Sequence, residues 1–344
     1  MKYAALSVAM TLGSGALGTL IPMKALWLPV WAAYAAATGT IATGCWVVAH
    51  ECGHFAFSEN KKLQTLVGFT LHSLLLVPYF SWQRSHAVHH ANTNHVIDGE
   101  THVPEMMENG GREVLQRREL LEKVFGKRIG GASFGVIQAV LHLVFGWPAY
   151  LLAGVTGGVS RGITNHFVPT SDSLFPGQWK GKVLKSTLGV AAACAGLAFW
   201  ASKAGVLRVA ALYGAPLAVT NMWLVLYTWL QHTDVDIPHF EADEWNMMKG
   251  AFHTVDRPYG KVLDFLHHRI GSTHVAHHVE SRIPHYHALE ATNALKEAFP
   301  DCYLFDPTPL PQALWRVASR TAAVDKIGDK WVFVQKSTPK PAAQ

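Results

Sequence analysis

Histidines in this sequence form three short clusters whose spacing suits metal binding. The patterns, written with x for any residue, are HxxxH once and HxxHH twice, and their members are His50, His54, His86, His89, His90, His274, His277 and His278. Residues three and four positions apart share one face of a helix. Each cluster therefore presents its imidazoles together, and imidazole is a good ligand for iron, copper, zinc and nickel.

The number of imidazoles indicates more than one ion. Eight nitrogen ligands exceed what one tetrahedral or octahedral ion needs, but they suit a pair of ions about 4 Å or more apart. A ninth candidate is His232, which ends an apolar segment and reaches the same face of the protein. Soluble di-iron bundles use glutamates and Glu-x-x-His pairs instead. We therefore expect a ligand set made almost wholly of histidine, with all nine residues as metal ligands.

Two other classes of protein use histidines in similar ways. Residues 50–54 read His-Glu-Cys-Gly-His and match the HExxH string of zinc proteases, but a zinc protease needs neither of the other two clusters. Transporters and receptors place polar groups inside their membrane spans, whereas these clusters lie beyond the ends of the apolar segments. Both classes fit the sequence less well than an enzyme with two metal ions.

The composition points to a membrane protein. Of 344 residues, 49% are hydrophobic and 15% charged, against about 25% charged residues in soluble domains. This excludes a disordered chain and disfavours an ordinary soluble enzyme. The 4 cysteines contain no CxxC pair, which argues against a disulfide framework. The net charge of +5 comes from basic residues beside apolar segments, which favours cytoplasmic loops over nucleic-acid binding.

The apolar segments must place all three clusters on one side of the membrane. A spanning helix needs about 20 apolar residues, and the number of crossings between two clusters on one side must be even. We therefore predict interfacial helices at 63–81 and 131–155, and spans at 3–23, 25–49, 183–203 and 207–231. The expected fold is an all-α integral membrane protein with four transmembrane helices in two hairpins and a cytosolic cap that holds the histidines.

Several stretches around the clusters resemble one known family. They include His50–Ser58, Leu76–Trp82, Asn165–Phe167, Leu230–Thr233, Thr254–Gly260, Ile283–His287, Glu290–Thr292 and Phe305–Asp306. Together with the histidines, they resemble the membrane fatty acid desaturases, specifically the delta-12/omega-3 acyl-lipid branch. The resemblance covers nearly the whole chain, so we expect residues 1–344 to form a single desaturase domain.

This resemblance implies a reaction and a cofactor. Members of the family use two non-haem iron ions, O2 and two electrons to convert adjacent methylenes of an acyl chain into a double bond. Glu51 in the first cluster resembles the delta-12 enzymes, which favours conversion of oleate to linoleate. The alternatives within the branch are omega-3 desaturation of linoleate to alpha-linolenate and a related hydroxylation or epoxidation. A membrane alkane or sterol hydroxylase is a further alternative with similar clusters.

The resemblance also implies partners and a location. The substrate is expected to be a fatty acyl group linked to a phospholipid. The sequence has no His-Pro-Gly-Gly haem motif, so a separate carrier must supply electrons, with cytochrome b5 and its reductase favoured over ferredoxin. That choice goes with an endoplasmic reticulum membrane and an active site facing the cytosol, a plastid membrane being the alternative. Family members usually begin with several dozen polar residues, so we expect this sequence to be a shortened or naturally short form.

Overall fold

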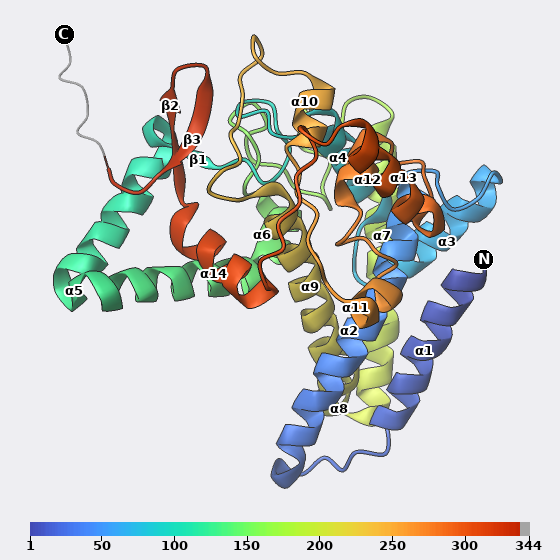
Figure 1. The fold of residues 1–344 in the computed structure, drawn as a ribbon. Helices are drawn as coiled ribbons and strands as arrows, with labels where there is room; N and C mark the ends of the chain where they lie inside the picture. The colour runs from blue at the N-terminus through green and yellow to red at the C-terminus, as the bar shows by residue number, and fades with distance from the viewer. Residues whose placement is uncertain (338–344) are drawn as a thin grey trace.

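Long helices form a bundle in the computed structural model of the protein, which describes residues 1–337. Figure 1 shows them side by side below a cap of shorter elements. They are α1 (Lys2–Gly18), α2 (Leu28–Gly53), α7 (Trp179–Ala204) and α9 (Ala215–His232), and the short helix α8 (Val206–Val209) leads into α9. A short link joins α1 to α2, and Gly205 turns the chain from α7 into α8 and α9. These are the two hairpins that the sequence predicts.

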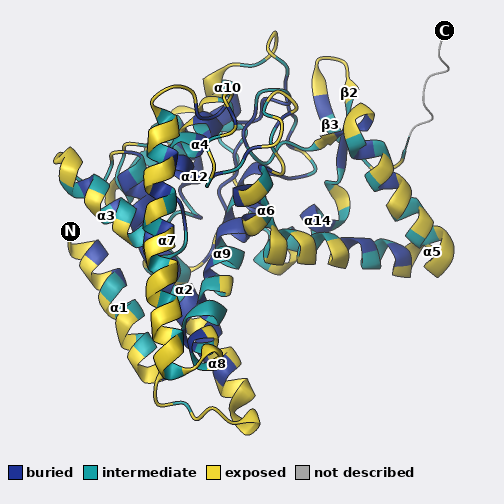
Figure 2. Ribbon diagram, turned by 180° about the vertical axis from the view of Figure 1, so that it is seen from behind, coloured by how far each residue is buried: buried dark blue, intermediate teal, exposed yellow. Residues whose placement is uncertain are grey.

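Glycines let these helices approach closely. A Cβ atom on Gly39 of α2 would lie 2.5 Å from the Cβ of Val219 on α9, and one on Gly18 of α1 would lie 2.3 Å from the ring of Tyr34. Such contacts leave no room for a side chain, as is common where helices pack inside membranes. By contrast, α7 shows exposed apolar residues such as Leu188 and Phe199 along its length (Figure 2). In a bilayer this face meets lipid.

The predicted number of membrane helices is confirmed. In residues 1–337, four helices are long and apolar enough to cross a membrane: Ala25–Gly53, Met107–Ala153, Trp179–Ala204 and Val206–His232. Three of these coincide with predicted spans, and the fold is the predicted all-α integral membrane type.

The fourth apolar helix differs from the predicted set. The sequence places a span at 3–23, where α1 has 17 residues, and an interfacial helix at 131–155. The structure has a long helical segment from α5 (Arg112–Val140) through a π-helical turn into α6 (Gly146–Ala153). The chain bends sharply at Gly126, whose φ is +78°. Beyond this bend α5 extends to one side of the bundle in Figure 1 and carries exposed apolar residues such as Ile137 and Val140.

A bent helix pair leads into the second histidine cluster. It consists of α3 (Lys61–Leu74) and α4 (Tyr79–Ala91), which meet at 104°. Asn60 begins α3 by accepting hydrogen bonds from two backbone amides, and Pro78, which lacks an N–H group, precedes α4. Together the two helices are long and apolar enough to form a broken span or a re-entrant loop, so the interfacial position of residues 63–81 stays a prediction.

The cap carries the remaining elements, among them a small sheet that the sequence does not predict. Its helices are α10 (Met247–Phe252), α11 (Lys261–Leu266), α12 (His274–Val279), α13 (His285–Ala298) and α14 (Leu310–Arg320). The strands are β1 (Glu105–Met106), β2 (Ala323–Ile327) and β3 (Lys330–Val334), in the order β1-β2-β3. The pair β1–β2 is parallel and β2–β3 is antiparallel, with Ala323 opposite both Glu105 and Val334.

Candidate metal centre

Histidines from all three sequence clusters converge where the bundle meets the cap. Two groups have ring nitrogens within 4.8 Å of one another. The first consists of His50, His54, His86 and His277, and the second of His89, His232 and His278. Segments far apart in the sequence supply these side chains: the ends of α2 and α9, and the C-terminal halves of α4 and α12.

The two other predicted ligands lie beside these groups. The Nε2 atom of His90 is 3.2 Å from Nε2 of His86, and Nε2 of His274 is 2.9 Å from Nε2 of His232. His90 also stacks on His278, which belongs to the other group, with ring centroids 4.0 Å apart. The structure thus brings all nine candidate residues into one continuous cluster.

Buried nitrogens without partners fit a metal centre. Several ring nitrogens in the cluster are shielded from solvent and have no hydrogen-bond partner among the described residues, including His54 Nε2, His277 Nε2 and His278 Nε2. An unpaired buried polar group is costly, and imidazole nitrogens facing one another in this way are suited to coordinate cations. The donor set therefore fits metal ions.

The cluster holds its imidazoles in the neutral form that binds metals. Burial lowers the pKa of His277 to about 3, with a further decrease from the nearby charge of His89. Burial, followed by the charges of His277 and His89, also brings the pKa of His54 well below its ordinary value of 6.5. A neutral imidazole keeps a lone pair for coordination, so no proton has to be displaced from these rings at neutral pH.

Side chains around the cluster fix the orientation of its ligands. The hydroxyl of Thr93 lies 3.1 Å from Nδ1 of His278, which leaves Nε2 to face the centre. The carboxylate of Asp256 accepts hydrogen bonds from the backbone amides of His274 and Val275, at 2.5 and 3.0 Å, where α12 begins. Partners of this kind tune ligand geometry and metal affinity.

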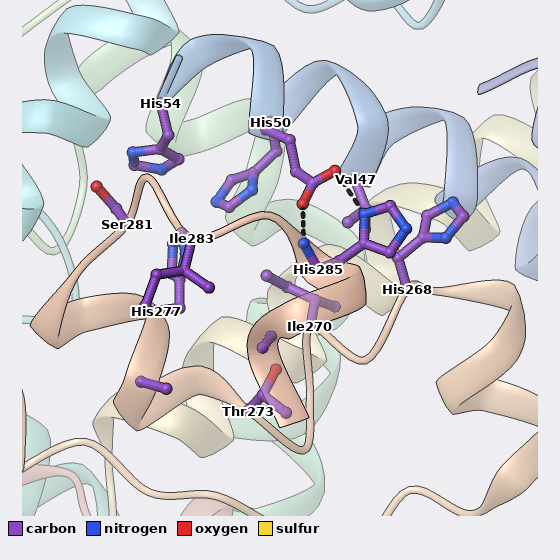
Figure 3. A pocket seen from close by; sticks show the side chains of 13 residues that line it. Val47, His50, His54, His268, Ile270, Thr273, His277, Ser281, Ile283 and His285 are labelled. Carbon is purple, nitrogen blue, oxygen red and sulfur yellow. Dashed lines mark hydrogen bonds and ion pairs between the residues drawn. The ribbon is translucent and has the colours of Figure 1, made fainter. Parts of the chain in front are cut away.

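A second set of contacts ties the first cluster to helix α13. Figure 3 shows His50, His54 and His277 around a small cavity, with His285 and His268 at its other end. The ring and the backbone amide of His285 hydrogen-bond to Glu51, the residue that follows His50.

An apolar cavity of about 80 Å³ adjoins the cluster on another side. Its lining includes His86, Trp46, Trp82, Trp147, Tyr150, Leu224 and Val225. Tryptophans at such positions are usually read as membrane-interface anchors, which is why sequence reasoning alone could not assign them to a channel. The cavity places an apolar, water-poor volume beside the candidate metal ligands.

One histidine beside the centre was missed by sequence reasoning. His102 has no partner at helical spacing, yet its ring stacks on His232 with centroids 5.3 Å apart and planes inclined by 11°. It also lines the apolar cavity. The backbone of His102 adopts a left-handed conformation with φ of +58°, in a loop whose path no periodic pattern reveals.

A helical bundle with lipid-facing helices and a buried histidine cluster at one end is the architecture of an integral membrane metalloenzyme. Comparison with known proteins gives the family: residues 25–308 match the family model described as fatty acid desaturase. The chain belongs to the fatty acid desaturase family, and it is an oxidoreductase that acts on fatty acyl groups.

Curated relatives cover most of the chain. The Delta(12)-fatty-acid desaturase of Arabidopsis thaliana is 40% identical over 91% of this chain and 78% of its own length. The Omega-6 fatty acid desaturase, endoplasmic reticulum, of Brassica juncea is 40% identical over 87% of this chain and 75% of its own. The Delta(12) fatty acid desaturase of Mortierella alpina is 39% identical, with 89% and 77% covered.

Proposed function

We propose that this protein is a delta-12 desaturase that converts oleate, linked to a membrane phospholipid, to linoleate. The observation that carries this proposal is the position of the histidine cluster beside an apolar cavity, in a chain whose relatives named above are delta-12 and omega-6 desaturases. Omega-3 desaturation is the alternative within the same branch. Hydroxylation or epoxidation of the acyl chain is a further alternative, because both reactions would use the same histidine cluster.

The cofactor in this proposal is a pair of non-haem iron ions held by nine histidines. His50, His54, His86 and His277 would hold one ion, with His90 beside them. His89, His232 and His278 would hold the other, with His274 beside them. Iron would supply the activation of O2 that cleavage of an unactivated C–H bond requires. The catalytic set is therefore the eight cluster histidines, and His232 completes the ligands.

The protein's own residues would position the acyl chain and exclude water. Trp46, Trp147 and Val225 line the cavity with apolar surface, and burying methylenes there is favourable by about 0.8 kcal/mol each. Holding one pair of methylenes beside the cluster determines which bond is oxidised, because positioning carries much of an enzyme's selectivity.

The overall reaction sets what the partners must supply. One O2, two electrons and two protons react with two methylenes to give one double bond and two water molecules. Electrons would come from cytochrome b5 and its reductase, and the relative named for the endoplasmic reticulum supports that membrane as the location. The histidine cluster would then face the cytosol.

The proposed topology treats residues 1–344 as one domain with four crossings. The spans would be α1, α2, α7 and the α8–α9 segment, which run side by side in Figure 1. The part of α5 beyond Gly126 would lie in the interface, because it extends sideways from the bundle in Figure 1 with apolar residues exposed. Both ends of the chain and the cap would then share one side of the membrane.

Expression in yeast tests the function directly, since yeast makes oleate and cytochrome b5 but no linoleate. Gas chromatography with location of double bonds should detect linoleate in cells that express the chain and none in cells that express His89→Ala. Linoleate from both would refute the ligand assignment. Alpha-linolenate formed from added linoleate, without any linoleate from oleate, would instead establish the omega-3 alternative.

A further inference from the structure

A carboxylic acid lies buried next to the apolar cavity without any role in metal binding. Glu100, in the loop between α4 and β1, is 3% exposed. The hydroxyl of Ser85 lies 2.5 Å from its Oε1 atom. Its Oε2 atom is shielded from solvent and has no hydrogen-bond partner among the described residues. Buried acids are rare unless paired, so this group calls for an explanation.

The carboxyl group of Glu100 begins a chain of hydrogen-bonded side chains. The Ser85 hydroxyl hydrogen-bonds to the hydroxyl of Tyr150 on α6, so three oxygen atoms are linked in series. Ser85 directly precedes the candidate ligand His86 on α4, and both Tyr150 and His86 line the apolar cavity. The chain thus connects a buried acid to the volume in which the acyl group would lie.

Desaturation needs protons in this volume. Of the four hydrogens in the two water molecules formed, the acyl chain supplies two and protons supply the other two. The electrons come from the one-electron carrier that the family's reaction requires. The surface of this cavity is mostly apolar, although histidines and threonines also line it, so a fixed chain of hydroxyl groups would guide a proton to one place in it.

We propose that Glu100 supplies protons to the reaction site through the hydroxyls of Ser85 and Tyr150. Each hydroxyl can donate and accept a hydrogen bond at the same time. A proton can therefore pass from the carboxyl group to Ser85 while Ser85 passes its own to Tyr150 and Tyr150 releases one into the cavity. Between turnovers the carboxylate takes up a new proton at Oε2, the oxygen that has no hydrogen-bond partner among the described residues. This inference depends on the desaturase activity and not on the position of the double bond.

The surroundings of Glu100 suit a group that gains and loses a proton near neutral pH. Burial raises its pKa to about 7, against the opposing effects of the Ser85 hydrogen bond, the charge of Arg161 and the contact with Tyr150. Arg161 and Tyr150 are the charged and titratable groups that face Glu100 from the segments packed against it. Arg161 is held by hydrogen bonds to the carbonyl oxygen of Asp98.

A purely structural role would give a different result from a proton-supplying role. If the Glu100 carboxyl only joins α4, α6 and the loop, the amide of Glu100→Gln, of nearly equal shape, would serve as well. If Glu100 supplies protons, the amide cannot, because it does not ionise in this range of pH. The matched control is Asp172→Asn, which makes the same chemical change at an exposed carboxylate that pairs with Lys180.

The experiment combines activity, iron content and infrared spectroscopy of the purified full chain. Glu100→Gln should keep its iron and lose desaturation about a hundredfold, while Asp172→Asn keeps wild-type activity. Wild-type activity should fall as pH rises through about 7, and the residual activity of Glu100→Gln should not follow that profile. Wild-type activity and an unchanged pH profile in Glu100→Gln would overturn the proposal.

The infrared readout does not depend on activity. Zinc-loaded wild-type protein should show a protonated carboxyl band at pH 6 that weakens by pH 8 and is absent from Glu100→Gln. Lack of this band in the wild type would overturn the proposal, even if the chain proved to make a different fatty acid. Should Glu100→Gln fail to fold, Tyr150→Phe interrupts the same chain and leaves the Glu100–Ser85 bond. It should lose activity with iron retained, and full activity would refute the path.

Discussion

The carboxylate of Glu51 accepts two hydrogen bonds from His285, a residue 234 positions further along the chain. One comes from the backbone amide of His285 at 2.5 Å, and the other from Nδ1 of its ring at 2.6 Å. Glu51 directly follows His50, and His285 is the first residue of α13. The contact fixes the end of α2, where two candidate ligands lie, to the cap that carries the third histidine cluster.

Weakening this contact should disturb the metal centre. In Glu51→Gln, one side-chain oxygen is replaced by an NH2 group that cannot accept a hydrogen bond from His285. Changes to groups that orient ligands typically cost about 10–100-fold in metal affinity or activity, so we expect a loss in that range. Iron content and desaturation in the purified variant measure it. Glu59→Gln, at an exposed position of the same segment, is the matched control, and equal behaviour of the two variants would contradict the role of Glu51.

Removal of the Asp256 carboxylate should loosen the third cluster. It accepts hydrogen bonds from the amide of His274 and from the hydroxyl of Tyr303, the latter at 2.5 Å. Asp256→Ala leaves buried donors unpaired, at a cost of about 1–3 kcal/mol each, and α12 loses its fixed start. We expect low iron content and a lower unfolding temperature. Tyr303→Phe keeps the hydrogen bond from His274 to Asp256 and should retain most of the iron. A larger loss of iron in Tyr303→Phe than in Asp256→Ala would contradict the role of Asp256.

A buried group of charges should make the stability of the cap depend on acid pH. Arg257 is fully buried and bonds to Asp306 at 2.9 Å, and Arg316 bonds to the same carboxylate at 2.6 Å. Burial acts to raise the pKa of Asp306, but hydrogen bonds from Thr308 and Arg316 and the charge of Arg257 lower it to about 2.

Because the folded pKa lies below the ordinary value of 3.8, folding favours the carboxylate. Its stabilisation is present above about pH 4 and is lost as pH falls through about 2. Thermal unfolding of metal-free protein in detergent should therefore show Asp306→Asn less stable than the wild type at pH 5, with the difference vanishing near pH 2. A difference that persists unchanged at pH 2 would contradict the ionised state of Asp306.

Filling the apolar cavity should change which acyl chains react. Val225 lines the cavity from α9, and a phenylalanine there would occupy part of a volume of about 80 Å³. We expect Val225→Phe to keep its iron but to lose activity on 18-carbon chains more than on shorter ones. Leu188→Phe, on the exposed face of α7, should leave the product profile unchanged. An unaltered profile in Val225→Phe would show that the acyl chain lies elsewhere.

The candidate ligands were easier to identify from the sequence than the residues around them. Helical spacing identifies His86, His89 and His90 as one set because local geometry alone decides which side chains share a face. The end of an apolar segment likewise identifies His232. In contrast, His102 and Glu100 come from an irregular loop, and their positions beside His232 and Ser85 depend on how that loop packs against α9 and α4.

Among the helices, too, those encoded within one segment were predicted, and features that depend on distant contacts were not. Hydrophobic length predicts α2, α7 and α9 because each is encoded within one segment. The path of α5 depends on the bend at Gly126, and a single glycine inside a helical pattern does not by itself predict such a bend. The sheet β1–β2–β3 joins segments some 220 residues apart, a pairing that short-range patterns cannot reveal.

The most direct test of the two-metal assignment is the metal content of the purified full chain, measured by mass spectrometry after expression with iron. Two clusters of buried, neutral imidazoles predict two iron ions per chain. Either His54→Ala or His278→Ala, one from each group, should lower that number. Two irons in the wild type would support the paired centre, whereas zinc, or no more than one iron in a chain that desaturates oleate, would contradict it.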